Sequence, residues 1–159
     1  MESVLTNSLL RFLKPIRQTR AARSVEYFGW IDLILGCLIL IVPVSIAGLF
    51  RLPPLSFEDA NCLRVVGVLV ATLGVLYIIS GRLNADGFVV ASMLDRPLVP
   101  LIMALLWLRG ILPGPLAIAF SVSDFGGFLW TALAWRKDIL HGENVGGPDL
   151  KQQIGRAHV

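Results

Sequence analysis

Asp124 is a carboxylate in a long apolar stretch of the sequence. Ser121 and Ser123 precede it, and the small residues Gly126 and Gly127, which let another helix pack closely, follow it. A charge at the middle of a bilayer costs about 2.5–3.5 kcal/mol on insertion scales, so such a side chain is expected to face other helices and to have a partner. Two interpretations stay open: Asp124 contacts a ligand or accepts a proton, or it is a structural carboxyl held by an ion pair or hydrogen bonds.

Asp32 is a second carboxylate inside an apolar run. It lies about 7 Å into that run from Tyr27, at 1.5 Å per helical residue. Arg82 and Arg96 are its expected partners, because their long side chains can reach inward from the same interface. A structural role is favoured for Asp32 over a catalytic one.

Arg64 and Arg109 are the arginines expected near Asp124. Either one can supply the planar guanidinium that donates two hydrogen bonds to a carboxylate, so we predict that one of them pairs with Asp124. Trp130 follows Asp124 by about one and a half helical turns. It is expected to pack in the core, with a pocket wall as the alternative.

No other residue pattern names a reaction. The sequence contains no serine-hydrolase, zinc-protease, phosphate-loop or dinucleotide-binding motif. Its two histidines, His141 and His158, fall in a polar C-terminal stretch, and Cys37 and Cys62 are far apart, so no metal site, cofactor or disulfide is predicted. Any catalysis would be acid–base chemistry by Asp124 and Asp32.

The composition is that of a membrane protein. Hydrophobic residues make up 55% of the 159 residues, and charged residues make up 16%, against roughly 25% in typical soluble domains. A soluble domain of this size has too little interior to hide so much apolar surface. The net charge is +3, but the basic residues flank apolar runs and form no stripe with stacking aromatic residues. Lipid head groups are therefore the expected counter-charge, and no nucleic acid is expected.

The apolar runs predict an all-α protein with four membrane-spanning helices in up-down order. The expected spans are residues 27–50, 62–80, 87–112 and 116–135. Pro43 is expected to kink the first span. For the third, we favour one long helix, capped by Asp86 and bent at Pro97 and Pro100, over a short interfacial helix followed by a separate crossing that begins at Pro97.

Gly67, Ala71 and Gly74 share one face of the second span. Small residues at this spacing let two helices approach closely in lipid, so a packing face is predicted, within the chain in preference to between chains.

The predicted organisation has three parts: a basic amphipathic helix on the membrane surface in residues 1–24, the membrane domain in 25–137 and a polar tail in 138–159. With this arrangement, eleven Lys and Arg residues fall on one side of the membrane and three on the other. The positive-inside rule then places both termini in the cytoplasm, with a bacterial inner membrane or a plasma membrane as the expected location. The alternative is that the Arg-rich start is a mitochondrial transit peptide.

Four closely connected spans with glycine-bearing helices, over roughly residues 27–135, resemble in layout the DoxX-like class of small bacterial membrane proteins. The resemblance implies a quinone-linked or accessory role, but no residue is carried over from it, and the lack of histidines in the spans gives no support to redox chemistry.

The leading prediction for function is a small non-catalytic membrane protein that serves as an accessory subunit or binds an apolar ligand. Its expected partners are the lipid bilayer and either another membrane subunit or a second copy of the chain. One alternative is a membrane enzyme, an isomerase or hydrolase of a lipophilic substrate that uses the carboxylates. The other is a small proton-coupled transporter acting as a dimer.

Overall fold

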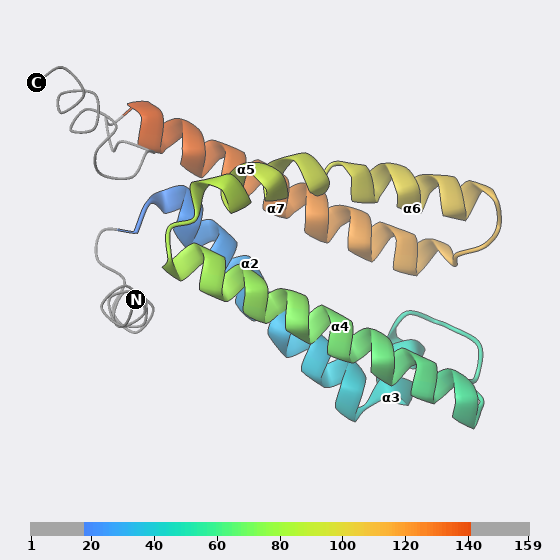
Figure 1. Cartoon of the computed structure of the whole chain (residues 1–159). Coiled ribbons are helices and arrows are strands. Elements are labelled where there is room, and N and C mark those ends of the chain that lie inside the picture. Colours follow the sequence, from blue (N-terminus) through green and yellow to red (C-terminus); the bar gives the residue numbers. More distant parts are fainter. Residues whose placement is uncertain (1–17, 141–159) are drawn as a thin grey trace, which may run out of the picture.

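The computed structural model describes residues 18–140, and all regular structure in that range is helical (Figure 1). In chain order, the helices are α2 (Arg20–Ile41), α3 (Pro43–Leu49), α4 (Phe57–Arg82), α5 (Asp86–Asp95), α6 (Leu98–Leu108) and α7 (Gly114–Leu140). Four segments are long and apolar enough to cross a membrane: Arg20–Ile41, Phe57–Arg82, Asp86–Leu108 and Gly114–Leu140. The prediction of an all-α protein with four membrane-length segments is therefore confirmed.

Local chemistry explains where several helices begin. The Thr19 side chain accepts a hydrogen bond from the amide of Ala22 at the start of α2. Ser56 and Asp59 form a capping box at the start of α4, in which each side chain binds the backbone of the other residue. Pro43 opens α3 directly after α2 ends, because a proline has no amide hydrogen with which to continue the preceding helix.

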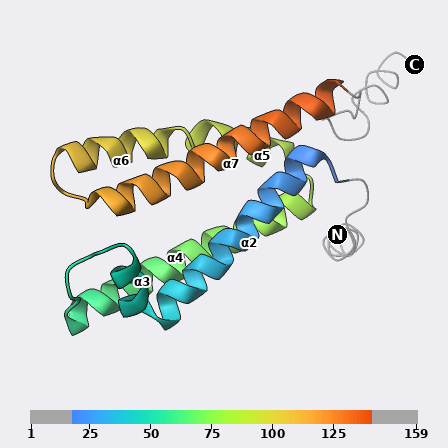
Figure 2. The same ribbon diagram turned by 180° about the vertical axis from the view of Figure 1, so that it is seen from behind.

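Helices α2 and α4 form a tightly packed antiparallel pair (Figures 1 and 2). A Cβ atom added to Gly29 would lie 2.7 Å from the carbonyl oxygen of Gly74, and one added to Gly67 would lie 2.7 Å from the amide nitrogen of Leu40. The two backbones are thus in direct contact at their glycines, as small residues permit in membrane helices.

Helix α7 forms the second antiparallel pair with α6 (Figure 1). It also contacts α2 and α5, whereas no backbone contact joins α4 to α6 or α7 within the part of the chain that the structure describes. The two pairs therefore meet at one end, which contains the start of α2 and the end of α7, and they diverge toward the other end (Figures 1 and 2). We call these the joined end and the open end.

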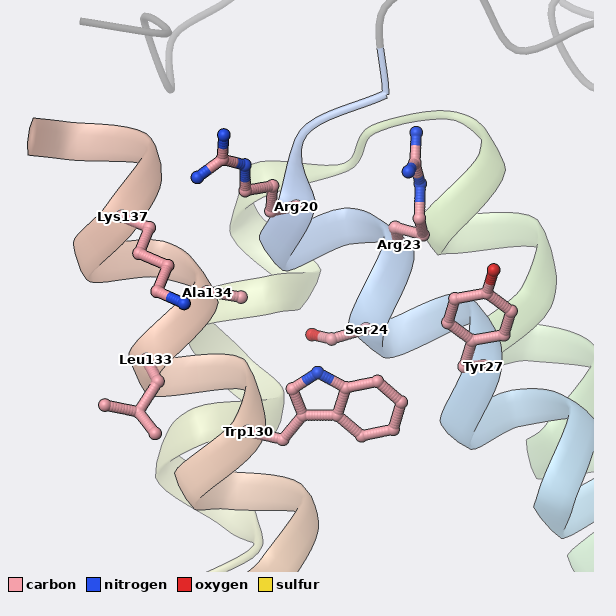
Figure 3. Close-up of a pocket in the computed structure, with 8 residues that line it drawn as sticks. All are labelled: Arg20, Arg23, Ser24, Tyr27, Trp130, Leu133, Ala134 and Lys137. Carbon is pink, nitrogen blue, oxygen red and sulfur yellow. The ribbon is translucent and has the colours of Figure 1, made fainter. Parts of the chain in front are cut away.

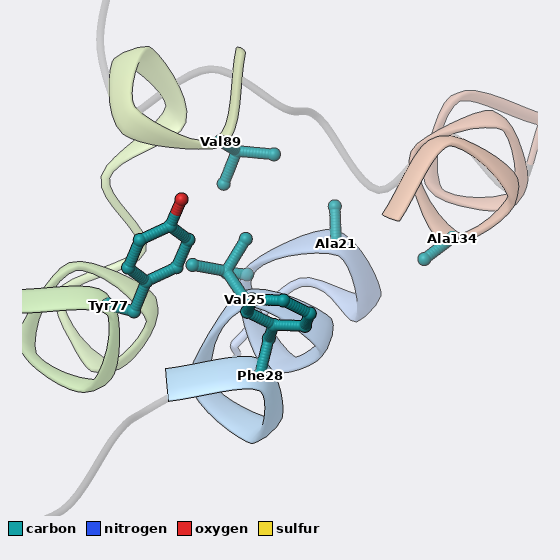
Figure 4. Close-up of a cluster of buried hydrophobic side chains, with 7 residues drawn as sticks. Ala21, Val25, Phe28, Tyr77, Val89 and Ala134 are labelled. Atoms are coloured by element: carbon teal, nitrogen blue, oxygen red, sulfur yellow. The ribbon is translucent and has the colours of Figure 1, made fainter. Parts of the chain in front are cut away.

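The buried core lies at the joined end. Side chains from α2, α4, α5 and α7 pack together there, and Figure 4 shows Val25 and Phe28 of α2 facing Tyr77 of α4 and Val89 of α5. Tyr77 also makes an edge-to-face contact with Phe88, with ring centroids 4.9 Å apart. Outside this core most large apolar side chains are exposed, which suits helices whose outer surface faces lipid.

Several predicted boundaries differ from the structure. The first span was predicted at 27–50, but α2 starts earlier and breaks at Val42, before α3. The third span consists of two consecutive helices, α5 and α6, separated at Arg96 and Pro97. Asp86 makes no side-chain cap hydrogen bond, so its predicted cap is wrong.

The two ends of the chain also differ from the prediction where they are described. Helix α7 continues to Leu140, so residues 138–140 are helical and do not belong to a polar tail. Residues 20–24, assigned to an N-terminal segment, belong to α2. The remainder of the predicted amphipathic helix and of the tail lies outside the described residues.

Candidate functional site

The first candidate site is a cavity of about 450 Å³ between the two helix pairs. Every described helix contributes to its wall, and most of the lining side chains are apolar, among them Leu35, Val66, Val99, Leu116 and Phe120. It exists because α4 makes no backbone contact with α6 or α7, so the space between the pairs is filled only where they meet. Its size falls within the roughly 300–1,000 Å³ of small-molecule sites.

Three carboxylates line this apolar cavity: Asp32 of α2, Asp95 of α5 and Asp124 of α7. Asp32 and Asp124 are partly buried, and their charges interact with each other. The two residues that the sequence singled out are thus brought to one cavity from different helix pairs. Tyr77 of α4 lines the same cavity.

Arg96 supplies the positive charge near these carboxylates. Its side chain is 1% exposed, and its guanidinium carbon lies 3.8 Å from the ring centroid of Phe28 and 5.2 Å from that of Tyr77. Such stacking on aromatic faces suits a desolvated guanidinium. The positive charge of Arg96 interacts with both Asp32 and Asp124.

The guanidinium of Arg96 is only partly hydrogen-bonded. Its Nη1 donates to the Thr131 hydroxyl at 3.4 Å, while Nε and Nη2 are buried and have no hydrogen-bond partner among the described residues. A buried donor without a partner is costly, so such a group needs an explanation. Arg96 is not among the described residues that line the cavity, so these two donors lie behind its wall.

The remaining predicted partners lie elsewhere. Arg82 binds Glu26, with 2.9 Å between Nε and Oε1, so of the two arginines proposed for Asp32 it is Arg96 that acts on it. Arg64 donates to Asn61 on its own helix at 2.7 Å, and Arg109 is exposed after α6. No ion pair joins Arg64 or Arg109 to Asp124 within residues 18–140, because both arginines lie at the open end.

The small residues have different surroundings. Gly67, Ala71 and Gly74 lie on the side of α4 that contacts α2, where a Cβ on Gly36 would clash with Ala71. Gly127 contacts Arg96, since an added Cβ would lie 2.6 Å from its Nη1. Gly126 faces open space, with nothing within 4 Å of an added Cβ, so it is not part of a packing face inside the chain.

Sequence reasoning did not identify the polar contacts that close the joined end. Asp138 near the end of α7 is fully buried and accepts hydrogen bonds from the amides of Arg20 at 3.2 Å and Ala21 at 2.8 Å. Asn84 accepts from both the amide and the hydroxyl of Thr19. No local pattern marks such pairs, because the partners of Asp138 are 117 and 118 residues away.

A comparison of the chain with protein-family models, curated proteins and solved structures finds no match. The resemblance to the DoxX-like class therefore rests on the layout of the spans alone. The helices themselves, by length and composition, are those of a multi-pass membrane protein. The feature of the described residues that offers chemistry is an apolar cavity with carboxyl groups on its wall.

Proposed function

We propose that this protein binds a lipophilic molecule with a hydrogen-bond-donating head group in the cavity between the two helix pairs. The observation that carries the proposal is that the cavity of about 450 Å³ is mainly apolar and reaches Asp32, Asp95 and Asp124. Apolar walls bind the body of such a ligand by burying its surface, and a few polar groups orient it.

The chemistry of the polar groups supports a donor as the head group. The oxygens of the three carboxyl groups accept hydrogen bonds, and none of the described residues that line this cavity is basic. An alkyl amine or an alcohol meets that requirement, whereas a head group that only accepts hydrogen bonds does not. In this proposal both termini are cytoplasmic and the protein resides in a bacterial inner membrane or a plasma membrane, in accord with the distribution of Lys and Arg.

Two matched photoreactive probes test the proposal. Both carry a diazirine on a twelve-carbon chain; one ends in an amine and the other in a methyl ester, which lacks a donor. We expect the amine probe to label cavity residues of the purified protein at least about tenfold more than the ester, a difference of about 1.4 kcal/mol, and the Asp32→Asn/Asp124→Asn variant to lose most of this preference. Equal labelling by both probes would contradict the assignment of the head group.

A substitution that fills the cavity provides a second test. Ala119 lines the cavity from α7, and Ala104 lies exposed on α6. Ala119→Trp should abolish labelling, because the indole occupies the space of the ligand, and Ala104→Trp should leave it unchanged. If Ala119→Trp folds normally and is labelled as strongly as the unmodified protein, the ligand does not bind in this cavity.

A catalytic function is the second candidate, favoured by the position of Asp32 and Asp124 on opposite helix pairs around one apolar cavity. One carboxyl group could then remove a proton and the other return it, as in an isomerase. Ligand recovered after incubation in deuterium oxide would carry carbon-bound deuterium, and Asp124→Asn would stop its incorporation. Ligand that gains no deuterium with the unmodified protein would exclude this chemistry.

A further inference from the structure

A second pocket, of about 300 Å³, lies at the joined end between the start of α2 and the end of α7 (Figure 3). It is separate from the central cavity, with which it shares no lining residue. Its wall combines basic, aromatic and apolar side chains: Arg20, Arg23, Ser24, Tyr27, Trp130, Leu133, Ala134 and Lys137. None of the described residues that line it is acidic.

The aromatic part of the pocket is a stacked pair. The rings of Tyr27 and Trp130 are nearly parallel, at an interplanar angle of 11° with centroids 6.0 Å apart, and each side chain is about half exposed, 52% and 49%. The prediction that Trp130 packs in the core is therefore wrong. In Figure 3 the hydroxyl of Tyr27 and the indole nitrogen of Trp130 point toward the end of the helices where Arg20 and Arg23 lie.

The basic part lies at the end of the membrane-length segments. Arg20 is the first residue of α2, and Lys137 is in the last turn of α7, so the cations come from two helices on either side of the pocket. Asp138, the nearby carboxylate, is fully buried and binds backbone amides of α2. It faces the helix start and not the pocket opening.

We infer that this pocket binds the head group of an anionic phospholipid. Arginine can donate two parallel hydrogen bonds to a phosphate. Arg20 and Arg23 lie at the end of a membrane-length helix, which is the level of the phosphates in a bilayer. Tyr27 and Trp130 are amphipathic rings of the kind that lie at the head-group level, and Leu133 extends the wall toward the apolar region along α7. Basic pockets between membrane helices bind anionic head groups in this way.

Native mass spectrometry of the full chain in detergent tests the site. The probes are phosphatidylglycerol and phosphatidylcholine with the same acyl chains, and sn-glycerol 3-phosphate serves as a head group without a lipid. We expect phosphatidylglycerol to bind most tightly and the Arg20→Gln/Arg23→Gln variant to lose about 25-fold in affinity for it, since each of the two arginines contributes a factor of roughly five. Arg51→Gln/Arg109→Gln removes the same charge at the open end and should change the affinity by less than about twofold.

Three outcomes would overturn the inference. The first is equal binding of the two lipids, and the second is an equal loss in both double variants, which would indicate general charge attraction. The third is glycerol phosphate binding as tightly as the lipid, which would identify a site for a soluble phosphate.

A second measurement does not depend on the arginine variants. With Trp30, Trp107 and Trp135 replaced by Phe, the fluorescence of Trp130 reports on the pocket alone. Phosphatidylglycerol with brominated acyl chains should quench it more than brominated phosphatidylcholine at the same mole fraction in nanodiscs. Equal quenching would contradict a head-group site beside Trp130.

Discussion

Arg96 is the residue on which the polar side of the central cavity depends. It is the buried cation that acts on Asp32 and Asp124, and it reaches this position because the helix breaks at Pro97, between α5 and α6. Stacking on Phe28 compensates part of the cost of removing the guanidinium from water.

Replacing Arg96 by Gln should lower the free energy of unfolding by about 2 kcal/mol or more, the size of a desolvated cation–π contact. The variant also leaves Asp32 and Asp124 without their counter-charge. The measurement is unfolding of the purified protein by SDS titration from mixed micelles. Arg109→Gln, at an exposed site, should change the value by less than about 0.5 kcal/mol. Equal stability of the two variants would contradict this role for Arg96.

The sequence identified Asp32 and Asp124 as unusual because a carboxylate in an apolar run is recognisable without a structure. It did not identify which arginine acts on them. That choice depends on the helix break at Pro97 and on which ends of the spans meet, and neither is encoded in residue spacing. The sequence did not identify Asp95 as a cavity residue. It lies at the same helix break, where a charged residue is expected to face solvent.

At the level of the helices, α2 and α4 are the most closely packed pair among the described helices, because their backbones touch at several glycines. The face formed by Gly67, Ala71 and Gly74 is visible in the sequence as a spacing of small residues. Gly29 and Gly36 of the partner helix are seven residues apart, as Gly67 and Gly74 are, but this shared separation does not by itself identify the two helices as partners. A spacing shows that a helix can be approached closely and does not show which helix approaches.

Gly29→Ala should destabilise the protein by about 1–3 kcal/mol, because the new methyl carbon would lie 2.7 Å from backbone atoms of Gly74 and Ile78. Neither atom can move without separating the helices. Gly126→Ala is the matched control, because its added Cβ meets nothing within 4 Å. It should be neutral or slightly stabilising, since alanine favours a helix over glycine. SDS titration of both variants checks this, and an equal effect would exclude close contact at Gly29.

The molecule as a whole consists of two helix pairs that meet at one end. Four spans in up-down order were predictable from hydropathy alone, because each apolar run is long enough to cross a bilayer. The divergence of the pairs was not predictable, since it results from contacts over long sequence separations, such as Ser24 with Thr131. The central cavity is a property of this arrangement and of no single segment.

Asp138→Asn should weaken the junction between the pairs by about 1–2 kcal/mol, the usual cost of losing a helix cap. Asn offers one acceptor oxygen where the carboxylate offers two, and both are used, by the amides of Arg20 and Ala21. The measurement is SDS unfolding, with Glu58→Gln at the exposed start of α4 as a control expected to have little effect. A stable Asp138→Asn variant would show that the junction does not depend on this carboxylate.

The contact between Asp138 and the start of α2 also bears on biogenesis. The amide of Arg20 finds its acceptor 118 residues later in the chain, so at about 5–20 residues per second the ribosome needs roughly 6–24 s to supply it. During that interval the first membrane-length segment begins with amide groups that lack this acceptor. A nascent chain that stalls before the last segment is made therefore differs from the finished protein at its first segment, where two backbone amides lack the acceptor that Asp138 supplies.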